Sequence, residues 1–138
     1  MSKLRSAPAQ VRVYQYAACG TCKKALRWLD TRGVSYVPVP IVEQPPSLAE
    51  LTRLVKASGK PARKWINTSG GSYRALVESR GKPAVEALSD AALLALLAAD
   101  GKMIKRPVVI AGDAVLVGFD EAAYEATFAA AEPARRPA

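Results

Sequence analysis

The chain has 138 residues, of which 50% are apolar and 23% are charged, as expected for one ordinary globular domain. It has a net charge of +8 and no histidine, which excludes Ser–His and Cys–His catalysis and removes the commonest zinc ligand. No run reaches the roughly 18 apolar residues of a membrane-spanning helix, and no apolar segment follows the basic start. We therefore expect a cytoplasmic protein that does not interact with a membrane.

The positive charge raises the question of nucleic-acid binding. Several basic residues lie near the two ends of the chain: Lys3, Arg5, Arg135 and Arg136. The others are scattered along predicted helices and form no single patch, so we expect no direct nucleic-acid binding. We predict one domain over residues 11–131, flanked by flexible tails at residues 1–10 and 132–138.

The first part of the chain predicts a strand, a helix and a second strand. Residues 11–16 alternate in the manner of a strand, with Val11 and Val13 on one face. A helix with apolar residues at helical spacing follows and stops at Gly33. Residues 34–39 predict a second strand at the edge of a sheet, because Pro38 has no N–H to donate. Two such strands joined by a helix run parallel.

Two helices are clearly predicted in the middle of the chain. The first ends before Gly59 and opens with a capping box formed by Ser47 and Glu50. The second covers residues 91–100, is capped by Ser89 or Asp90 and ends at Gly101. Apolar residues recur at helical spacing in the first of them, so we expect it to cover a core.

The last part predicts a hairpin and a closing helix. Strands at 107–111 and 115–118 are joined by a tight turn at residues 112–113, and Asp120 caps the helix that follows. The complete order is βαβ, a helical stretch, and ββα. This is the order of an α/β thioredoxin-like fold with a helical insertion in the middle.

Cys19 and Cys22 are the two cysteines of the chain, and they lie between the first strand and the first helix. Inside a cell this spacing indicates either metal binding or thiol redox chemistry, and a closed zinc site would need further ligands that this chain lacks. The start of a helix stabilises a thiolate through its free N–H groups and its dipole.

We expect Cys19, ahead of the helix, to be the nucleophile, and Cys22, one turn in, to resolve a mixed disulfide formed on Cys19. Lys23 and Lys24 are expected to add positive charge nearby. The alternative is that both cysteines simply pack near the start of the helix.

Arg106 and Pro107 open the strand that follows the helical stretch. In proteins of thioredoxin-like fold, a proline at this place is cis and faces the cysteines, which implies that Arg106 lies beside Cys19. There its planar guanidinium would stabilise the thiolate or hold an oxyanion substrate. The alternative is an ordinary surface arginine before a strand.

The segment from Lys64 to Arg74, KWINTSGGSYR, is a further candidate, with a turn between two short helical stretches. Its hydroxyls, amides and glycines fit a loop that binds an anion or docks a partner. The alternative is an ordinary turn in which a hydroxyl caps the next helix, from Thr68, Ser69 or Ser72. Trp28 and Trp65 fit packing in a core or groove better than stacking on a ligand.

Four segments together resemble a known family: YAACGTCKKALRWL, KWINTSGGSYRAL, LAADGKMIKRPVVI and VLVGFDEAAYE. They are similar to the family shared by Spx/MgsR regulators and the glutaredoxin-coupled, ArsC-like arsenate reductases, over about residues 11–128. The resemblance implies a thioredoxin-like fold with a helical insertion and no bound cofactor. It also implies that Cys19 is the catalytic cysteine and that Arg106 is one of the reductases' three substrate-binding arginines.

The chain departs from the reductases at several positions. Their other two arginines align with Asn67 and Phe119, and their His-Asn-Pro before the catalytic cysteine is replaced by Gln15, Tyr16 and Ala17. A doubly charged oxyanion is best held by converging bidentate arginines, and this chain offers one at the aligned positions. We therefore do not expect robust arsenate reduction.

The resemblance leaves two functions open. One is an arsenate-reductase-like thiol-disulfide oxidoreductase that is reduced by glutathione and glutaredoxin or by thioredoxin. The other is a redox-sensing transcription regulator, because Spx-like regulators carry the same cysteine pair and bind the RNA polymerase alpha subunit. A third reading, a binding module with incidental cysteines, predicts ordinary thiol reactivity.

Overall fold

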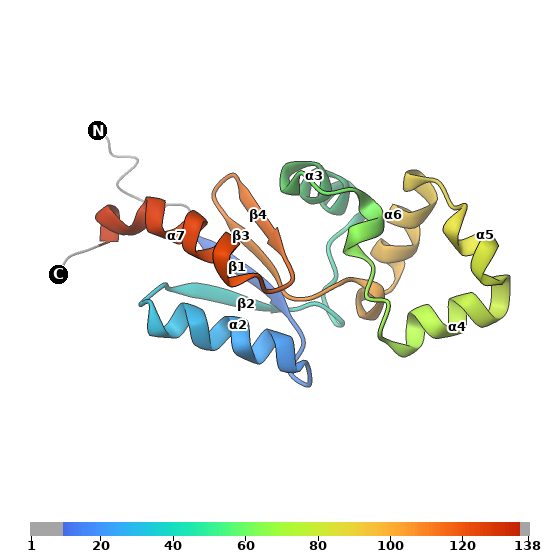
Figure 1. The fold of residues 1–138 in the computed structure, drawn as a ribbon, viewed down its shortest axis with the longest axis horizontal. Helices are drawn as coiled ribbons and strands as arrows, with labels where there is room; N and C mark the ends of the chain where they lie inside the picture. Colours follow the sequence, from blue (N-terminus) through green and yellow to red (C-terminus); the bar gives the residue numbers. More distant parts are fainter. Residues whose placement is uncertain (1–9, 136–138) are drawn as a thin grey trace.

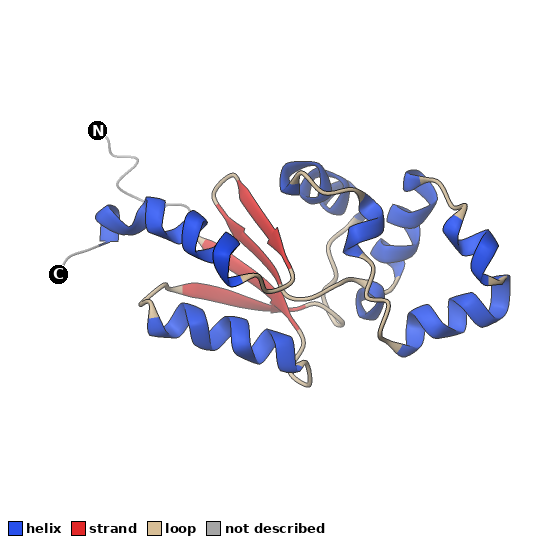
Figure 2. Cartoon of the chain, in the orientation of Figure 1, coloured by secondary structure: helices blue, strands red, loops and turns tan. Residues whose placement is uncertain are grey.

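The computed structural model describes residues 10–135 and the side chains as far as residue 128. Its four strands are β1 (Val11–Gln15), β2 (Tyr36–Pro40), β3 (Val108–Ala111) and β4 (Ala114–Val117). They form one sheet in the order β2-β1-β3-β4 (Figure 2). β1 and β2 are parallel, and β3 is antiparallel to both β1 and β4. This is the predicted α/β thioredoxin-like arrangement, with β2 at the edge of the sheet.

Two helices cover one face of the sheet (Figure 1). α2 (Gly20–Thr31) follows β1, and α7 (Glu121–Arg135) follows β4. Their inward side chains and those of the central strands form one buried cluster: Val13, Ala25, Trp28, Leu29, Val109, Tyr124 and Phe128.

The helical insertion covers the other face. α3 (Leu48–Ser58) packs against β4 and against α6 (Asp90–Ala99). A larger buried cluster joins these helices to the sheet and includes Tyr14, Ile41, Leu51, Leu54, Trp65, Leu93, Leu97, Ile104, Val108 and Ile110.

Both faces of β1 are therefore buried, because successive side chains of a strand point to opposite sides. Val13 is fully buried against α2 and α7, and Tyr14 is 5% exposed on the side of the insertion. The predicted strand is therefore confirmed. The alternation identified the strand correctly but did not show that a second layer covers it.

The insertion also contains η1 (Ala62–Trp65), α4 (Gly71–Arg80), α5 (Lys82–Glu86) and η2 (Gly101–Met103). The sequence predicted helical structure at η1 and α4 but not at α5. α5 has five residues, of which Val85 alone is buried, so it is too short to show a helical period. Figure 1 places α4 and α5 at the end of the molecule remote from the sheet.

Gly101 has a different role from the one predicted. α6 ends at Ala99 with Asp100 as its C-cap, and Gly101 opens η2 without a positive φ. A Cβ at Gly101 would lie 2.1 Å from the carbonyl oxygen of Ile41. Glycine is therefore required here by the close approach of two backbone segments and not by a left-handed helix end.

The predicted tails fall mostly outside the described residues, and α7 is described as far as Arg135, beyond the predicted domain end at residue 131. The division into one domain with two tails remains a prediction. Within residues 10–135, every helix is too short or too polar to cross a membrane.

Candidate active site

Cys19 is the N-cap residue of α2 and has extended backbone angles, with φ −89° and ψ 118°. Its Sγ accepts a hydrogen bond from the backbone N–H of Cys22 at 3.2 Å. Its own N–H donates to the carbonyl of Tyr16 at 2.9 Å, which fixes the short loop between β1 and α2. The sulfur thus takes the place of the oxygen that usually caps a helix.

The two thiols differ in exposure. Both are free cysteines, and Cys19 is partly exposed, whereas Cys22 is 1% exposed on the inward side of α2. Cys22 therefore lies against the core and Cys19 meets solvent. An external reagent can reach Cys19 first.

The pKa values of the thiols differ in the same sense. Burial raises the pKa of Cys19. The hydrogen bonds from Cys22 and the guanidinium of Arg106 lower it by more than burial raises it, so the pKa of Cys19 is below its ordinary value. Burial and the neighbouring Cys19 raise the pKa of Cys22 to about 12. At neutral pH the exposed sulfur is thus much more readily ionised than the buried one.

Arg106 lies next to Cys19, as the sequence predicted. The peptide bond between Arg106 and Pro107 is cis. The Nη1 of Arg106 donates to the carbonyl of Lys102 at 3.0 Å, and its Cζ lies over the ring of Tyr16, 5.0 Å from the centroid. Its positive charge acts on both thiols, because it lowers the pKa of Cys22 as well as that of Cys19.

The lysines after the pair, Lys23 and Lys24, lie on the exposed side of α2, and a role for Lys23 beside the thiolate stays a prediction. The groups that lower the pKa of Cys19 are the hydrogen bonds from Cys22 and the charge of Arg106, and neither lysine is among them. A flexible, hydrated ammonium at an exposed position is largely screened by water.

In the segment from Lys64 to Arg74, the side chain of Asn67 shares a hydrogen-bond acceptor with Arg106. The Nδ2 of Asn67 donates to the carbonyl of Lys102 at 3.3 Å, the same oxygen that accepts from Arg106. The Oδ1 of Asn67 accepts from the N–H of Ser69 at 3.3 Å. Asn67 thus stabilises the turn, and it is connected to Arg106 through the carbonyl of Lys102, to which both side chains donate.

The hydroxyls of this segment do not cap the helix that follows. Gly70 is the N-cap of α4, and no side chain caps it. Arg74 lines an open depression of about 550 Å³ with six other residues: Thr68, Tyr73, Val77, Glu78, Lys82 and Glu86. The depression contains both acids and bases, so its charge does not favour an anion.

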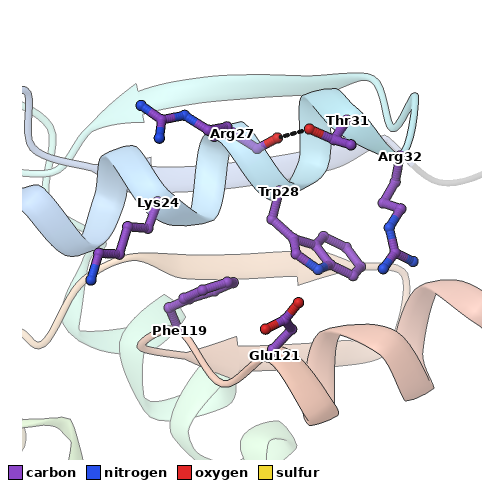
Figure 3. Close-up of a pocket in the computed structure, with 7 residues that line it drawn as sticks. All are labelled: Lys24, Arg27, Trp28, Thr31, Arg32, Phe119 and Glu121. Atoms are coloured by element: carbon purple, nitrogen blue, oxygen red, sulfur yellow. Dashed lines mark hydrogen bonds between the residues drawn. The ribbon is translucent and has the colours of Figure 1, made fainter.

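A second open groove, of about 360 Å³, lies between α2 and the start of α7 (Figure 3). Figure 3 shows Lys24 and Trp28 pointing from α2 toward Phe119 and Glu121. Neither cysteine lines this groove. Trp28 is 8% exposed and Trp65 is fully buried, which confirms the prediction that both pack in the interior.

Tyr16 is the site residue that sequence analysis missed. It was noted there as a departure from the reductase pattern and was given no role. An aromatic residue shortly before a Cys-x-x-Cys pair is only a weak indication of a role in the site. The role of Tyr16 depends on its contact with Arg106, which is 90 residues away in the chain and cannot be seen from the local sequence.

A Cys-x-x-Cys pair at the start of the first helix, beside an arginine that precedes a cis-proline, together with this sheet defines a dithiol protein of thioredoxin-like fold. More closely, the chain belongs to the ArsC family, whose model matches residues 14–127. The resemblance stated from the sequence is thereby confirmed.

Several relatives place the chain within this family. It is 43% identical to the uncharacterized protein YusI of Bacillus subtilis over 116 residues, which cover 84% of this chain and 96% of YusI. It is 32% identical to an arsenate reductase of Rhizobium meliloti over 73% of this chain and 69% of that protein. Global transcriptional regulator Spx 2 of Bacillus cereus is 24% identical over 80% of this chain and 81% of its own.

The structure resembles a crystal structure of an ArsC family related protein from Bacteroides fragilis. The TM-score is 0.78 and the sequence identity is 37%, over 86% of this chain and 98% of the other. The likeness therefore covers the insertion as well as the sheet.

Proposed function

We propose that this protein is a thiol-disulfide oxidoreductase in which Cys19 is the nucleophile and Cys22 is the resolving thiol. The observation that carries the proposal is the contrast between the two sulfurs. Cys19 is partly exposed at a helix N-cap with a lowered pKa, and Cys22 is buried one turn away with its pKa raised to about 12. An attacking thiolate and a protected second thiol need these two environments.

The reaction takes two exchange steps. The Cys19 thiolate attacks one sulfur of a substrate disulfide, forms a mixed disulfide and releases the other sulfur as a thiolate that takes up a proton. Cys22 then loses its proton and attacks the Sγ of Cys19, which releases the second substrate thiol. Two electrons pass from the dithiol to the substrate, and a Cys19–Cys22 disulfide remains.

The second step needs a thiolate at Cys22. Burial and the neighbouring Cys19 raise the pKa of Cys22, while the charge of Arg106 lowers it. Once Cys19 is bound in a mixed disulfide, its negative charge is gone and Arg106 continues to act on Cys22. The first step therefore promotes ionisation of the thiol that performs the second.

A disulfide fits the site better than arsenate does. At the positions of the other two reductase arginines, Asn67 donates to the carbonyl of Lys102, and the ring of Phe119 packs edge-on against Tyr124 at 4.9 Å. Arg106 is then the one guanidinium among the three aligned positions. Two neutral side chains do not balance the charge of a doubly charged oxyanion.

Regeneration needs an external two-electron donor, for which we propose glutathione with glutaredoxin, or thioredoxin. Two donor thiols reduce the Cys19–Cys22 disulfide by the same exchange chemistry and become a disulfide themselves. Such donors keep thiols reduced in the cytoplasm, where we place the protein.

A single-turnover experiment tests the proposal. The reduced protein is mixed with one equivalent of a small model disulfide, and the products are identified by mass spectrometry. We expect the wild type to form the Cys19–Cys22 disulfide and two free small thiols, and Cys22→Ser to stop at a mixed disulfide on Cys19. A mixed disulfide on Cys22, or no reaction with wild type at neutral pH, would overturn the assignment.

A second candidate function is a redox-controlled regulator that binds the RNA polymerase alpha subunit. It is favoured by the contact between the site and the insertion, because Arg106 and Asn67 share the carbonyl of Lys102. A disulfide at Cys19 would remove the thiolate beside Arg106 and alter that contact. Retention of the alpha subunit by this protein, lost on oxidation or in Cys19→Ser, would support this function over the enzyme.

A further inference from the structure

Tyr16 contacts both the arginine and the backbone of the thiol residue. The Cζ of Arg106 lies 5.0 Å from the centroid of its ring, within the range of a cation–π interaction. The carbonyl of Tyr16 accepts the N–H of Cys19 at 2.9 Å. The same residue therefore connects the charge to the loop on which the nucleophile lies.

The guanidinium of Arg106 is attached to the backbone through its Nη1 atom. Nη1 donates to the carbonyl of Lys102, and Nε is buried with no hydrogen-bond partner among the described residues. A long side chain held by this hydrogen bond and by its interaction with the Cys19 thiol can still rotate about them. The face of the Tyr16 ring limits that rotation, because leaving the ring forfeits the cation–π contact.

We propose that Tyr16 is a positioning residue whose ring holds the Arg106 guanidinium against Cys19. The inference rests on the proposed thiol-disulfide chemistry and adds a residue to it. Tyr16 stands where the reductases have asparagine, and an amide has no aromatic face to offer. Because Asn67 and Phe119 replace the other two arginines, the position of the remaining guanidinium controls the charge around Cys19.

The test is the pH dependence of Cys19 alkylation by iodoacetamide in the reduced full-length protein. Tyr16→Leu removes the ring and keeps an apolar side chain, and Tyr16→Phe keeps the ring and removes the hydroxyl. We expect Tyr16→Leu to shift the midpoint of the rate profile to higher pH and to slow alkylation at pH 6.5 by about two- to fivefold. We expect Tyr16→Phe to match the wild type.

A double-mutant cycle with Arg106→Ala distinguishes positioning of Arg106 by the Tyr16 ring from a direct effect of the Tyr16 substitution on the loop that carries Cys19. If the ring acts through Arg106, Tyr16→Leu has no further effect on the midpoint once Arg106 is alanine. An equal shift with and without Arg106 would overturn the proposal, as would a shift in Tyr16→Phe as large as that in Tyr16→Leu. An unshifted Tyr16→Leu profile would also overturn it.

Two controls keep the outcome clear. Thermal unfolding shows whether Tyr16→Leu is folded, and Tyr16→Met provides a second variant without a ring. The chemical shift of the Arg106 Nε–H group depends directly on the aromatic ring next to it. We expect this ¹⁵N–¹H resonance to change position in Tyr16→Leu and Tyr16→Met and to keep its position in Tyr16→Phe. Alkylation needs no substrate or electron donor, so this result is independent of whether the protein turns over a disulfide.

Discussion

The backbone N–H of Cys22 donates to the Sγ of Cys19 at 3.2 Å, so one cysteine of the pair stabilises the thiolate of the other. Burial, together with the neighbouring Sγ of Cys19, raises the pKa of Cys22 and keeps its side chain protonated. The asymmetry of the pair thus follows from its placement, with one sulfur at the helix cap and the other on the inward face one turn later.

This asymmetry predicts selective alkylation. At pH 7, one equivalent of iodoacetamide should modify Cys19 at least about tenfold faster than Cys22, because Cys19 is both more exposed and more ionised. Peptide mass spectrometry after quenching measures the two rates. Cys22→Ser should leave the modification of Cys19 rapid, and equal labelling of both cysteines in the wild type would contradict the assigned environments.

The raised pKa of Cys22 predicts a loss of stability at alkaline pH. The unfolded chain releases this proton near the ordinary value of 9.0 and the folded chain releases it at about 12. Stabilisation by the protonated thiol is therefore complete below pH 9 and is lost between pH 9 and 12. The slope reaches about 1.4 kcal/mol per pH unit for one proton.

Urea unfolding at a series of pH values from 8 to 11 measures this loss. Burial also raises the pKa of Tyr124, which adds to the loss above pH 10. Cys22→Ala removes the thiol and should flatten the profile between pH 9 and 10. A profile that is the same in Cys22→Ala and the wild type would contradict the prediction.

Gly101→Ala should destabilise the protein by about 2 kcal/mol or more, because the new Cβ would meet the carbonyl oxygen of Ile41 at 2.1 Å. The two backbone segments would have to separate. Gly71→Ala is the matched control, since a Cβ at Gly71 meets nothing within 4 Å and alanine favours the helix α4. We expect the midpoint of urea unfolding to fall for Gly101→Ala and to hold or rise for Gly71→Ala.

Tyr124→Phe tests how the last helix is attached to the sheet. The phenol of Tyr124 is fully buried and donates to the carbonyl of Gly118 at 2.8 Å. Phenylalanine keeps the ring contacts with Trp28 and Phe119 and leaves that carbonyl unpaired. We expect a loss of about 1–2 kcal/mol in the free energy of unfolding, and an unchanged value would mean that this hydrogen bond contributes little.

Much of the fold is predictable because its signals are local. The Oγ of Ser47 accepts from the N–H of Glu50, Gly59 has φ +75° at the end of α3, and Gly112 turns the β3–β4 hairpin. Each is a property of a few neighbouring residues. The position of Cys19 at a helix cap is predictable for the same reason, because strand, loop and helix follow one another directly.

What could not be predicted depends on residues far apart in the chain. The carboxylate of Glu50 forms an ion pair with Arg12 of β1, 38 residues away in the chain, which no local pattern indicates. The contact of Gly101 with Ile41 and that of Tyr16 with Arg106 also arise from the folded chain. The position of Arg106 near Cys19 was expected only from the resemblance to thioredoxin-like proteins, because no local pattern brings these two residues together.

The central claim is that the pair transfers electrons from a cellular thiol donor to a disulfide. The most direct measurement is NADPH consumption coupled through glutathione and glutaredoxin, and separately through thioredoxin, with a model disulfide or arsenate as substrate. We predict that the wild type turns over the disulfide, that arsenate gives little turnover, and that Cys19→Ser loses activity. No turnover of the disulfide by a wild-type protein that readily forms its Cys19–Cys22 disulfide would contradict the claim and favour the regulatory function.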